Sequence, residues 1–365
     1  LAENIISQIA AGKQEQAIQP IDAPDFGDFA LSVGQKTMWV QHKMAPKSIF
    51  NPVYAVRVHA RLDADALYQA LQKIVNRHPA LRTTFHYKHG EHFQRVHEYM
   101  DVFFQIISAE KWSEEQVQAR IEALAAEDFD LAKGPLFKTY LFELSADEHI
   151  LIVSAHHIIT DMWSLAIVIN EIGRLYLNPE KPLLPLRLRY TDFIQWQNGM
   201  LAGAEGEKMW HYWSNKLRGR LPVLELPLDK PRPAVQTFTG RNASLKLGAE
   251  LTQQLQKVSD ERGVTLYMTL LAAFYTLLYK NTGQDDLIVG TPTTGRSRAE
   301  IMDVVGYFVN PVALRTNIRK NEPFAALLEQ VRQTVTEALS NQDYPLYQLI
   351  ERLMPMRDTS RTPLF

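Results

Sequence analysis

The stretch HILIVSAHHIITDMWS, residues 149–164, decides the fold of this 365-residue chain. A run of apolar residues leads directly into the adjacent histidines His156 and His157, and Asp161 follows. We expect a buried strand that ends at the histidines and a helix that begins near Ser164. Such a strand-to-helix junction can present a side chain to a cleft, where a histidine exchanges protons near neutral pH.

Other interpretations of this stretch remain open from the pattern alone. A histidine at a strand end is often only a packed residue, and two neighbours on a strand point to opposite faces. At most one of the two histidines therefore faces a given cleft. His157 and Asp161 could meet on one helix face as metal ligands, but no further ligand lies near them in the sequence.

Strand and helix patterns alternate on both sides of the histidine stretch. Residues 53–62 (VYAVRVHARL) alternate like a strand, and Asp63 or Asp65 is placed to cap the helix that follows. Ser113 and Gln116 form a capping-box pattern. Further strands are expected at residues 140–144, 150–155, 243–247 and 287–290, and helices at 163–176, 251–262, 266–279 and from Asn321 and Pro323 onward. This alternation predicts an α/β two-layer design.

The order of elements also predicts the domain organisation. Residues 1–11 have the apolar spacing of a helix, and residues 12–29 have the composition of a linker. We expect residues 1–30 to be the tail of an upstream domain and a linker, although an ordinary N-terminal helix fits equally well. A strand-then-helix order recurs in both halves, and the proline-rich residues 179–185 separate them. Two related lobes are therefore expected, at residues 31–182 and 183–365.

The composition excludes several classes of function. The formal net charge is -2, so no basic field favours nucleic acid. The chain has no cysteine, which removes disulfides, thiolate metal sites and a cysteine nucleophile, and which fits a cytoplasmic protein. No secretion signal opens it, and its most apolar helical run, residues 267–279, is too short to cross a bilayer. We therefore expect neither a nucleic-acid nor a membrane partner.

Seven stretches, in order, resemble the core motifs of the condensation domains of nonribosomal peptide synthetases, the HHxxxDG family. They are residues 31–39 (LSVGQKTMW), 77–85 (RHPALRTTF), 155–164 (AHHIITDMWS), 190–196 (YTDFIQW), 305–315 (VGYFVNPVALR), 341–347 (NQDYPLY) and 357–364 (RDTSRTPL). The chain departs from the family pattern in Met162, where the pattern has glycine, and in Lys36, Leu346 and Tyr347. Family members continue beyond the seventh motif, so we expect the second lobe to be truncated.

The resemblance implies a fold, a reaction and partners. The expected fold is two chloramphenicol-acetyltransferase-like lobes that form a V-shaped pseudo-dimer with a central tunnel. The expected enzyme is an amide-forming acyltransferase. An upstream donor carrier protein and a downstream acceptor carrier protein would present the substrates on phosphopantetheine arms, beside adjacent synthetase domains. No tightly bound cofactor and no metal are expected.

The resemblance also assigns roles to residues. His157 is expected to be the functional histidine, as general base or as positioner of the amine. His156 is expected to be structural. Asp161 is expected to be structural too, and to pair with Arg298 or, failing that, with Arg296 or Arg315.

Two further positions are expected to support the site. Asn310 would help to shape the tunnel, or it would only be a turn residue before Pro311. Arg82 would support the structure.

Met162 and Trp163 bear on the donor. Met162 either fills a gap in the core or reshapes the tunnel and so selects the donor. The DMWS sequence resembles condensation domains of hybrid polyketide/peptide synthetases, which implies a polyketide or fatty acyl donor. Two other functions remain as alternatives: a catalytically silent condensation-like docking module, and a free-standing acyltransferase that uses coenzyme A.

Overall fold

The computed structural model of the chain describes residues 17–44, 47–353, 358 and 360–365. Contacts divide these residues into two compact units. The N-terminal unit comprises residues 17–199 and Arg298–Val309, and the C-terminal unit comprises Met200–Ser297 and Asn310–Phe365. The dividing point expected at residue 182 lies instead at residue 199, because side chains of residues 188–194 are buried in the N-terminal core. The proline-rich stretch interrupts the chain without ending the unit.

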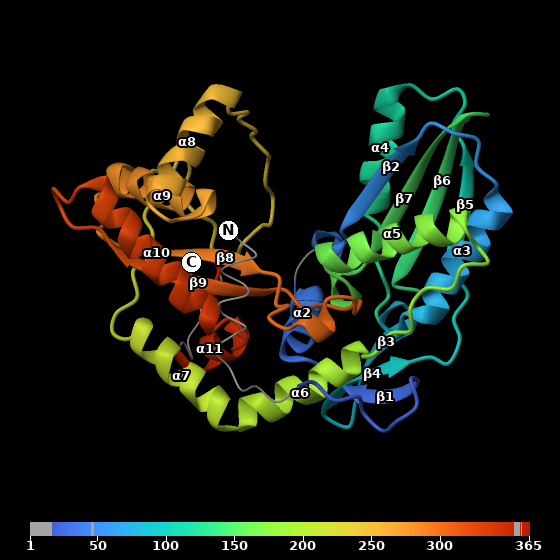
Figure 1. Cartoon of the computed structure of the whole chain (residues 1–365), viewed down its shortest axis with the longest axis horizontal. Coiled ribbons are helices and arrows are strands. Elements are labelled where there is room, and N and C mark those ends of the chain that lie inside the picture. Colours follow the sequence, from blue (N-terminus) through green and yellow to red (C-terminus); the bar gives the residue numbers. More distant parts are fainter. Residues whose placement is uncertain (1–16, 45–46, 354–357, 359) are drawn as a thin grey trace. The chain divides into compact units, whose positions relative to one another are not determined.

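The described part of the N-terminal unit contains two sheets, four whole α-helices and most of a fifth (Figure 1). Its elements are β1 (Gly27–Ala30), α2 (Val33–Met44), β2 (Val53–Val58), α3 (Ala64–Arg77), β3 (Thr83–Lys88), β4 (Glu91–Val96), β5 (Phe103–Ser108), α4 (Glu114–Ala125), β6 (Phe137–Ser145), β7 (Glu148–Ala155), α5 (Met162–Leu177) and the start of α6 (Tyr190–Ala202). One sheet has the order β1-β4-β3 and the other β2-β7-β6-β5. Among the strands that the structure describes in this unit, only β5 and β6 pair in parallel.

The larger sheet is covered by helices on both faces (Figure 1). Alternate residues of β7 follow this division: Leu151 and Val153 join the core formed with α3 and α5, whereas Ile150 and Ile152 join a second cluster with α4. The unit is therefore α/β, as predicted, with a third layer that the two-layer expectation lacked. Burial on both faces explains why β7 reads as one continuous apolar run.

Residues 17–30 pack onto the N-terminal unit. Ile18 is buried, the Arg189 guanidinium donates to the carbonyls of Ile21 and Ala23, and the Ile21 amide donates to Asp192. β1 then pairs antiparallel with β4. The prediction that residues 12–29 form a linker is thus wrong from residue 17 onward. The local sequence did not show this, because the residues that bind this segment are distant in the sequence. The helix expected at residues 1–11 lies outside the described residues.

The C-terminal unit contains α7 (Ala204–Lys216), α8 (Ala249–Glu261), α9 (Leu266–Thr282), β8 (Asp286–Thr293), β9 (Asn310–Asn317), α10 (Phe324–Ser340) and α11 (Leu346–Leu353). β8 and β9 pair antiparallel, and α9, α10 and α11 supply most of the apolar core that covers them. The two expected helices and the short strand at residues 287–290 are confirmed.

Two expectations in the C-terminal unit are wrong. No strand forms at residues 243–247, where Leu245 is 87% exposed, because no neighbouring strand supplies hydrogen bonds to that segment. Asn321 and Pro323 were expected to open α10 as its N-cap and its first helical residue, but Pro323 is itself the N-cap, since its ψ of 144° is still extended. Within the described residues, no helix is both long enough and apolar enough to span a bilayer.

Candidate functional site

The histidine motif lies where β7 ends in the N-terminal unit. β7 pairs with β6 along its whole length and with β2 from His149 to Ser154, and the His156 amide still donates to the Leu136 carbonyl one residue beyond the strand. A 3₁₀ turn, His157–Ile159, follows directly. α5 begins at Met162, capped by Asp161. The predicted strand-to-helix junction is therefore confirmed, with a short turn between the two elements.

His156 is completely buried. Its Nδ1 accepts from the Ile158 amide at 3.1 Å, and its Nε2 lies 3.1 Å from His42 Nδ1. Burial first, and then the nearby charges of His42 and His157, lower the pKa of His156 to about 3. The ring is therefore neutral at pH 7. Because its Nδ1 accepts, its Nε2 carries the proton and donates to His42.

His157 is half-buried and is held differently. Its Nδ1 lies 2.6 Å from the Thr160 carbonyl, which can only accept, so Nδ1 carries the proton of the neutral ring. Nε2 is then the lone-pair nitrogen. The Tyr307 ring meets the imidazole edge-to-face, with centroids 5.1 Å apart. This tautomer leaves His157 able to accept a proton or a hydrogen bond from a substrate.

Asp161 is buried and joins two parts of the N-terminal unit. Its Oδ1 accepts from the Ser164 amide at 2.7 Å and caps α5. Its Oδ2 accepts from the Phe308 amide at 3.1 Å. Ser164 adds two more bonds to the same segment, because its Oγ donates to the Gly306 carbonyl and accepts from the Gly306 amide. The third and fifth predicted motifs are thus bound together.

Each of the three arginines expected near Asp161 has contacts or burial of its own. The Arg298 guanidinium lies 4.5 Å from the centre of the Trp196 ring, within the N-terminal unit. Arg315 belongs to the C-terminal unit, where it makes a bidentate ion pair with Asp286, so it serves β8 and β9. Arg296 is buried, also in the C-terminal unit. The pairing of Asp161 with Arg298 stays a prediction.

Asn310 and Arg82 both make hydrogen bonds that fix loops. Asn310, at the start of β9, donates to the carbonyls of Gln342 and Tyr344 and accepts from the Leu346 amide. These bonds tie the start of β9 to residues 342–346 within the C-terminal unit. Arg82 is buried and donates to the His97 carbonyl and to Asp25.

Met162 and Trp163 form the exposed first turn of α5. Met162 is 72% exposed and Trp163 is 41% exposed. The Trp163 indole donates to the Met302 carbonyl at 2.9 Å. The interpretation of Met162 as a core filler is wrong, because the first turn of α5 projects this side chain into solvent within its unit.

Several residues around the histidines escaped prediction as site residues. Gln35, Tyr190 and Tyr307 lie inside stretches that match the family motifs, so position in a motif was the available signal. The Gln35 amide donates to the Ile158 carbonyl at 3.2 Å, in the turn that carries His157. His42 lies outside the quoted motifs, and only the fold brings it to His156.

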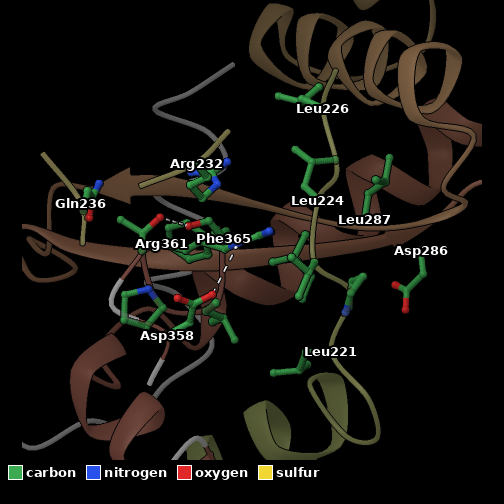
Figure 2. A pocket seen from close by; sticks show the side chains of 16 residues that line it. Leu221, Leu224, Leu226, Arg232, Gln236, Asp286, Leu287, Asp358, Arg361 and Phe365 are labelled. Atoms are coloured by element: carbon green, nitrogen blue, oxygen red, sulfur yellow. Dashed lines mark hydrogen bonds and ion pairs between the residues drawn. The ribbon is translucent and has the colours of Figure 1, made fainter. Parts of the chain in front are cut away.

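A separate cavity of about 290 Å³ lies in the C-terminal unit (Figure 2). It is lined by residues 221–224, Leu226, Arg232, Gln236, residues 286–288, Asp358 and residues 361–365. None of the predicted site residues lines it, so it is not the predicted site. Within the described residues, no three histidine or carboxylate side chains are grouped to hold a metal ion.

Comparison with known proteins identifies the family. Residues 27–365 match the family model described as "Condensation domain". The chain is 40% identical over 357 residues to tyrocidine synthase 3 of Brevibacillus parabrevis. This match covers 98% of this chain and 5% of that protein. It is also 40% identical over 366 residues to gramicidin S synthase 2 of Brevibacillus brevis, across 100% of this chain and 8% of that protein. The chain thus spans less than a tenth of the length of these relatives.

Solved structures agree with this assignment. The X-domain from teicoplanin biosynthesis matches with a TM-score of 0.85 and 26% identity, over 96% of this chain and 78% of that one. All the motifs described above, including the turn that carries His157, lie inside the range matched by the family model.

Proposed function

This chain belongs to the condensation domain family of nonribosomal peptide synthetases, and on that premise we propose that His157 is the residue that serves its amide-forming reaction. The carrying observation is the geometry of the ring. Nδ1 is committed to the Thr160 carbonyl, which leaves Nε2 as the nitrogen that can receive a proton or a hydrogen bond. His156 cannot serve, because it is buried and both of its nitrogens are engaged.

In the proposed reaction, the amine of an acceptor substrate attacks the thioester carbonyl of a donor. The new C–N bond forms, the C–S bond breaks, and the donor carrier's phosphopantetheine thiol leaves. The proton lost by the nitrogen passes to His157 Nε2 or to solvent, and one proton returns from there to the sulfur, which leaves as the thiol. Because an α-amine has a pKa of only about 8, much of it is already nucleophilic at neutral pH. Positioning the amine and stabilising the charged intermediate then contribute at least as much as proton removal.

The partners in this proposal are an upstream donor carrier, a downstream acceptor carrier and the adjacent domains of a synthetase. No cofactor is bound tightly, since the phosphopantetheine arms belong to the carriers. The pairing of Asp161 with Arg298 and a tunnel role for Asn310 belong to the same proposal. The cytoplasmic location belongs to it too.

A silent docking module is the second candidate. It is favoured by the likeness to the X-domain from teicoplanin biosynthesis, of which a complex with OxyB has also been solved, and by the departure at Met162. The intact His157 and Asp161 favour catalysis.

Mass spectrometry distinguishes a catalytic domain from a silent docking module. The probes are a carrier loaded with octanoyl and a pool of carriers loaded with single amino acids.

We expect the octanoyl mass to appear as an amide on an acceptor carrier. The appearance of product only when octanoyl-coenzyme A replaces the donor carrier would point to the free-standing acyltransferase instead. No product from either donor, or from a peptidyl-loaded donor, would favour the docking module.

We further propose that Met162 contacts the donor arm and favours an acyl donor from a polyketide or fatty acid module. Its exposure at the first turn of α5, close in the chain to His157, supports this. We predict that the chain prefers an octanoyl donor to an N-acetyl-dialanyl donor when the two compete, and that Met162→Gly weakens the preference. Met44→Ala, which removes another exposed methionine, is the matched control.

A clear preference of the natural chain for the peptidyl donor would contradict the donor proposal. An unchanged preference in Met162→Gly would remove Met162 from it.

A further inference from the structure

A tyrosine that has no part in the proposed reaction, Tyr307, packs against one side of the His157 ring. We propose that Tyr307 is a positioning residue that fixes the His157 imidazole, and that Tyr190 holds Tyr307 in place. The inference rests on the proposed function of His157. All of these residues belong to the N-terminal unit.

Tyr307 restricts the ring where its own hydrogen bond does not. The bond from His157 Nδ1 to the Thr160 carbonyl fixes one nitrogen, but the ring can still tilt about that bond. The Tyr307 ring blocks this tilt, since it meets the imidazole at an interplanar angle of 78° with centroids 5.1 Å apart. This is the edge-to-face geometry that aromatic rings prefer. Together the hydrogen bond and the ring contact fix the direction in which the lone pair of Nε2 points.

Tyr307 is itself held by its backbone. Its carbonyl accepts from the Tyr190 hydroxyl, which is buried at the start of α6. The Ser32 Oγ lies 3.0 Å from the same hydroxyl. Because the hydroxyl spends its one proton on Tyr307, Ser32 must donate to it. Tyr190 therefore links the segment before α2 to the segment that carries Tyr307.

Two glycines show how closely these rings are packed. A Cβ added to Gly306 would lie 2.1 Å from Cδ2 of Tyr190, and one added to Gly34 would lie 2.9 Å from Cε1 of Tyr307. Both rings thus lie directly against backbone. Neighbouring amides of the same segment are bound by Asp161 and Ser164, so Tyr307 has little freedom to move.

The first test compares Tyr307→Leu with Tyr307→Phe, using the octanoyl donor and the acceptor that the natural chain uses best. We expect Tyr307→Leu to lower kcat about tenfold with KM changed less than twofold, because orientation and not binding is lost. Tyr307→Phe keeps the ring and should recover most of that rate. A Tyr307→Leu rate within twofold of the natural chain, or a Tyr307→Phe as slow as Tyr307→Leu, would overturn the proposal.

The second test removes one hydroxyl and leaves the rings intact. Tyr190→Phe should also lower kcat severalfold. The matched control is Tyr275→Phe, which removes a buried hydroxyl that donates to the Leu314 carbonyl in the C-terminal unit. Both variants should lose similar thermal stability, and only Tyr190→Phe should lose rate. Equal rates in the two variants would show that Tyr190 is merely structural.

A spectroscopic measurement separates this inference from the proposed function. In chain labelled with ¹⁵N-histidine, the His157 signals are identified by their loss in His157→Ala. We expect a single Nδ1-protonated tautomer in the natural chain and in Tyr307→Phe, and averaged or broadened signals in Tyr307→Leu. Signals of Tyr307→Leu identical to the natural chain would overturn the positioning role whatever the rates show. Full activity of His157→Ala would instead overturn the proposed function and leave the positioning result readable.

Discussion

Two neighbouring histidines have been given opposite environments by one turn of backbone. His156 completes the buried strand pattern and faces the core with His42, whereas His157 begins the 3₁₀ turn and remains half-buried. The sequence predicted that only one would serve a site. It could not supply the reason, which is that the turn directs one ring to Ile158 and the other to Thr160.

The buried state of His156 predicts a dependence of stability on pH. Its pKa is lowered to about 3 in the folded chain, against about 6.5 when unfolded, so the unfolded chain binds more protons between these values. The stability that comes from keeping His156 neutral is fully present above about pH 6.5 and is lost as the pH falls toward 3. His156→Asn preserves an acceptor for the Ile158 amide and removes the titrating ring.

We therefore expect the free energy of unfolding of the natural chain to fall more steeply than that of His156→Asn between pH 6 and 4, by up to about 1.4 kcal/mol per pH unit. Urea titrations at a series of pH values measure both slopes. Parallel slopes would show that His156 does not titrate as its burial implies.

At the scale of elements, caps were the most predictable feature. Ser113 and Gln116 form the predicted capping box of α4 in both directions, and Asp63 caps α3. These motifs are local, so a few adjacent residues contain the whole interaction. Two strands were mispredicted for the opposite reason: β1 forms although it was not predicted, and the strand predicted at residues 243–247 does not form. A strand exists only where a distant partner pairs with it, and a local pattern does not contain that partner.

Asp161 makes both a local and a long-range contact, since it caps α5 and also accepts a hydrogen bond from the Phe308 amide, which is distant in the sequence. Asp161→Ala should lower the free energy of unfolding by about 2–4 kcal/mol, as a lost cap plus a buried amide without its acceptor. Asp161→Asn should lose an amount of unfolding free energy between zero and the loss of Asp161→Ala. The Oδ1 of the asparagine can still cap the helix, but its NH2 group cannot accept a hydrogen bond from the Phe308 amide.

The matched control for this prediction is Asp63→Ala, which removes an exposed N-cap that accepts from the Ala66 amide and should cost about 1 kcal/mol. Urea unfolding of all three variants gives the comparison. A loss in Asp161→Ala no larger than that in Asp63→Ala would mean that the Phe308 contact contributes nothing.

At the scale of the whole molecule, the order of motifs predicted the family, and the contacts revised the division into units. Residues 183–199 and Arg298–Val309 belong with the histidine motif, because their buried side chains join the N-terminal core. The sequence placed Tyr307 and Phe308 in a second lobe, since proximity along the chain suggested it. The candidate site is accordingly built from four segments that are distant in the sequence, and only His157 and Asp161 among its key side chains were predictable from local pattern.

The whole-molecule account also predicts how the reaction depends on pH. If His157 accepts the proton during the attack, kcat should fall at acid pH, and this fall should be absent in His157→Ala. If His157 only positions the amine, the residual rate of the variant should keep the pH profile of the natural chain. Stopped-time mass spectrometry with loaded carriers measures both profiles.

The most direct test of the central claim is the single-turnover rate of amide formation between two loaded carriers, for the natural chain and for His157→Ala. His149→Asn is the control, because His149 lies at the opposite end of β7, where its Nδ1 bonds to the Ala60 carbonyl. We predict that His157→Ala forms product at least about 100-fold more slowly while it unfolds at the same temperature. His149→Asn should retain the rate. A rate for His157→Ala within twofold of the natural chain would contradict the account.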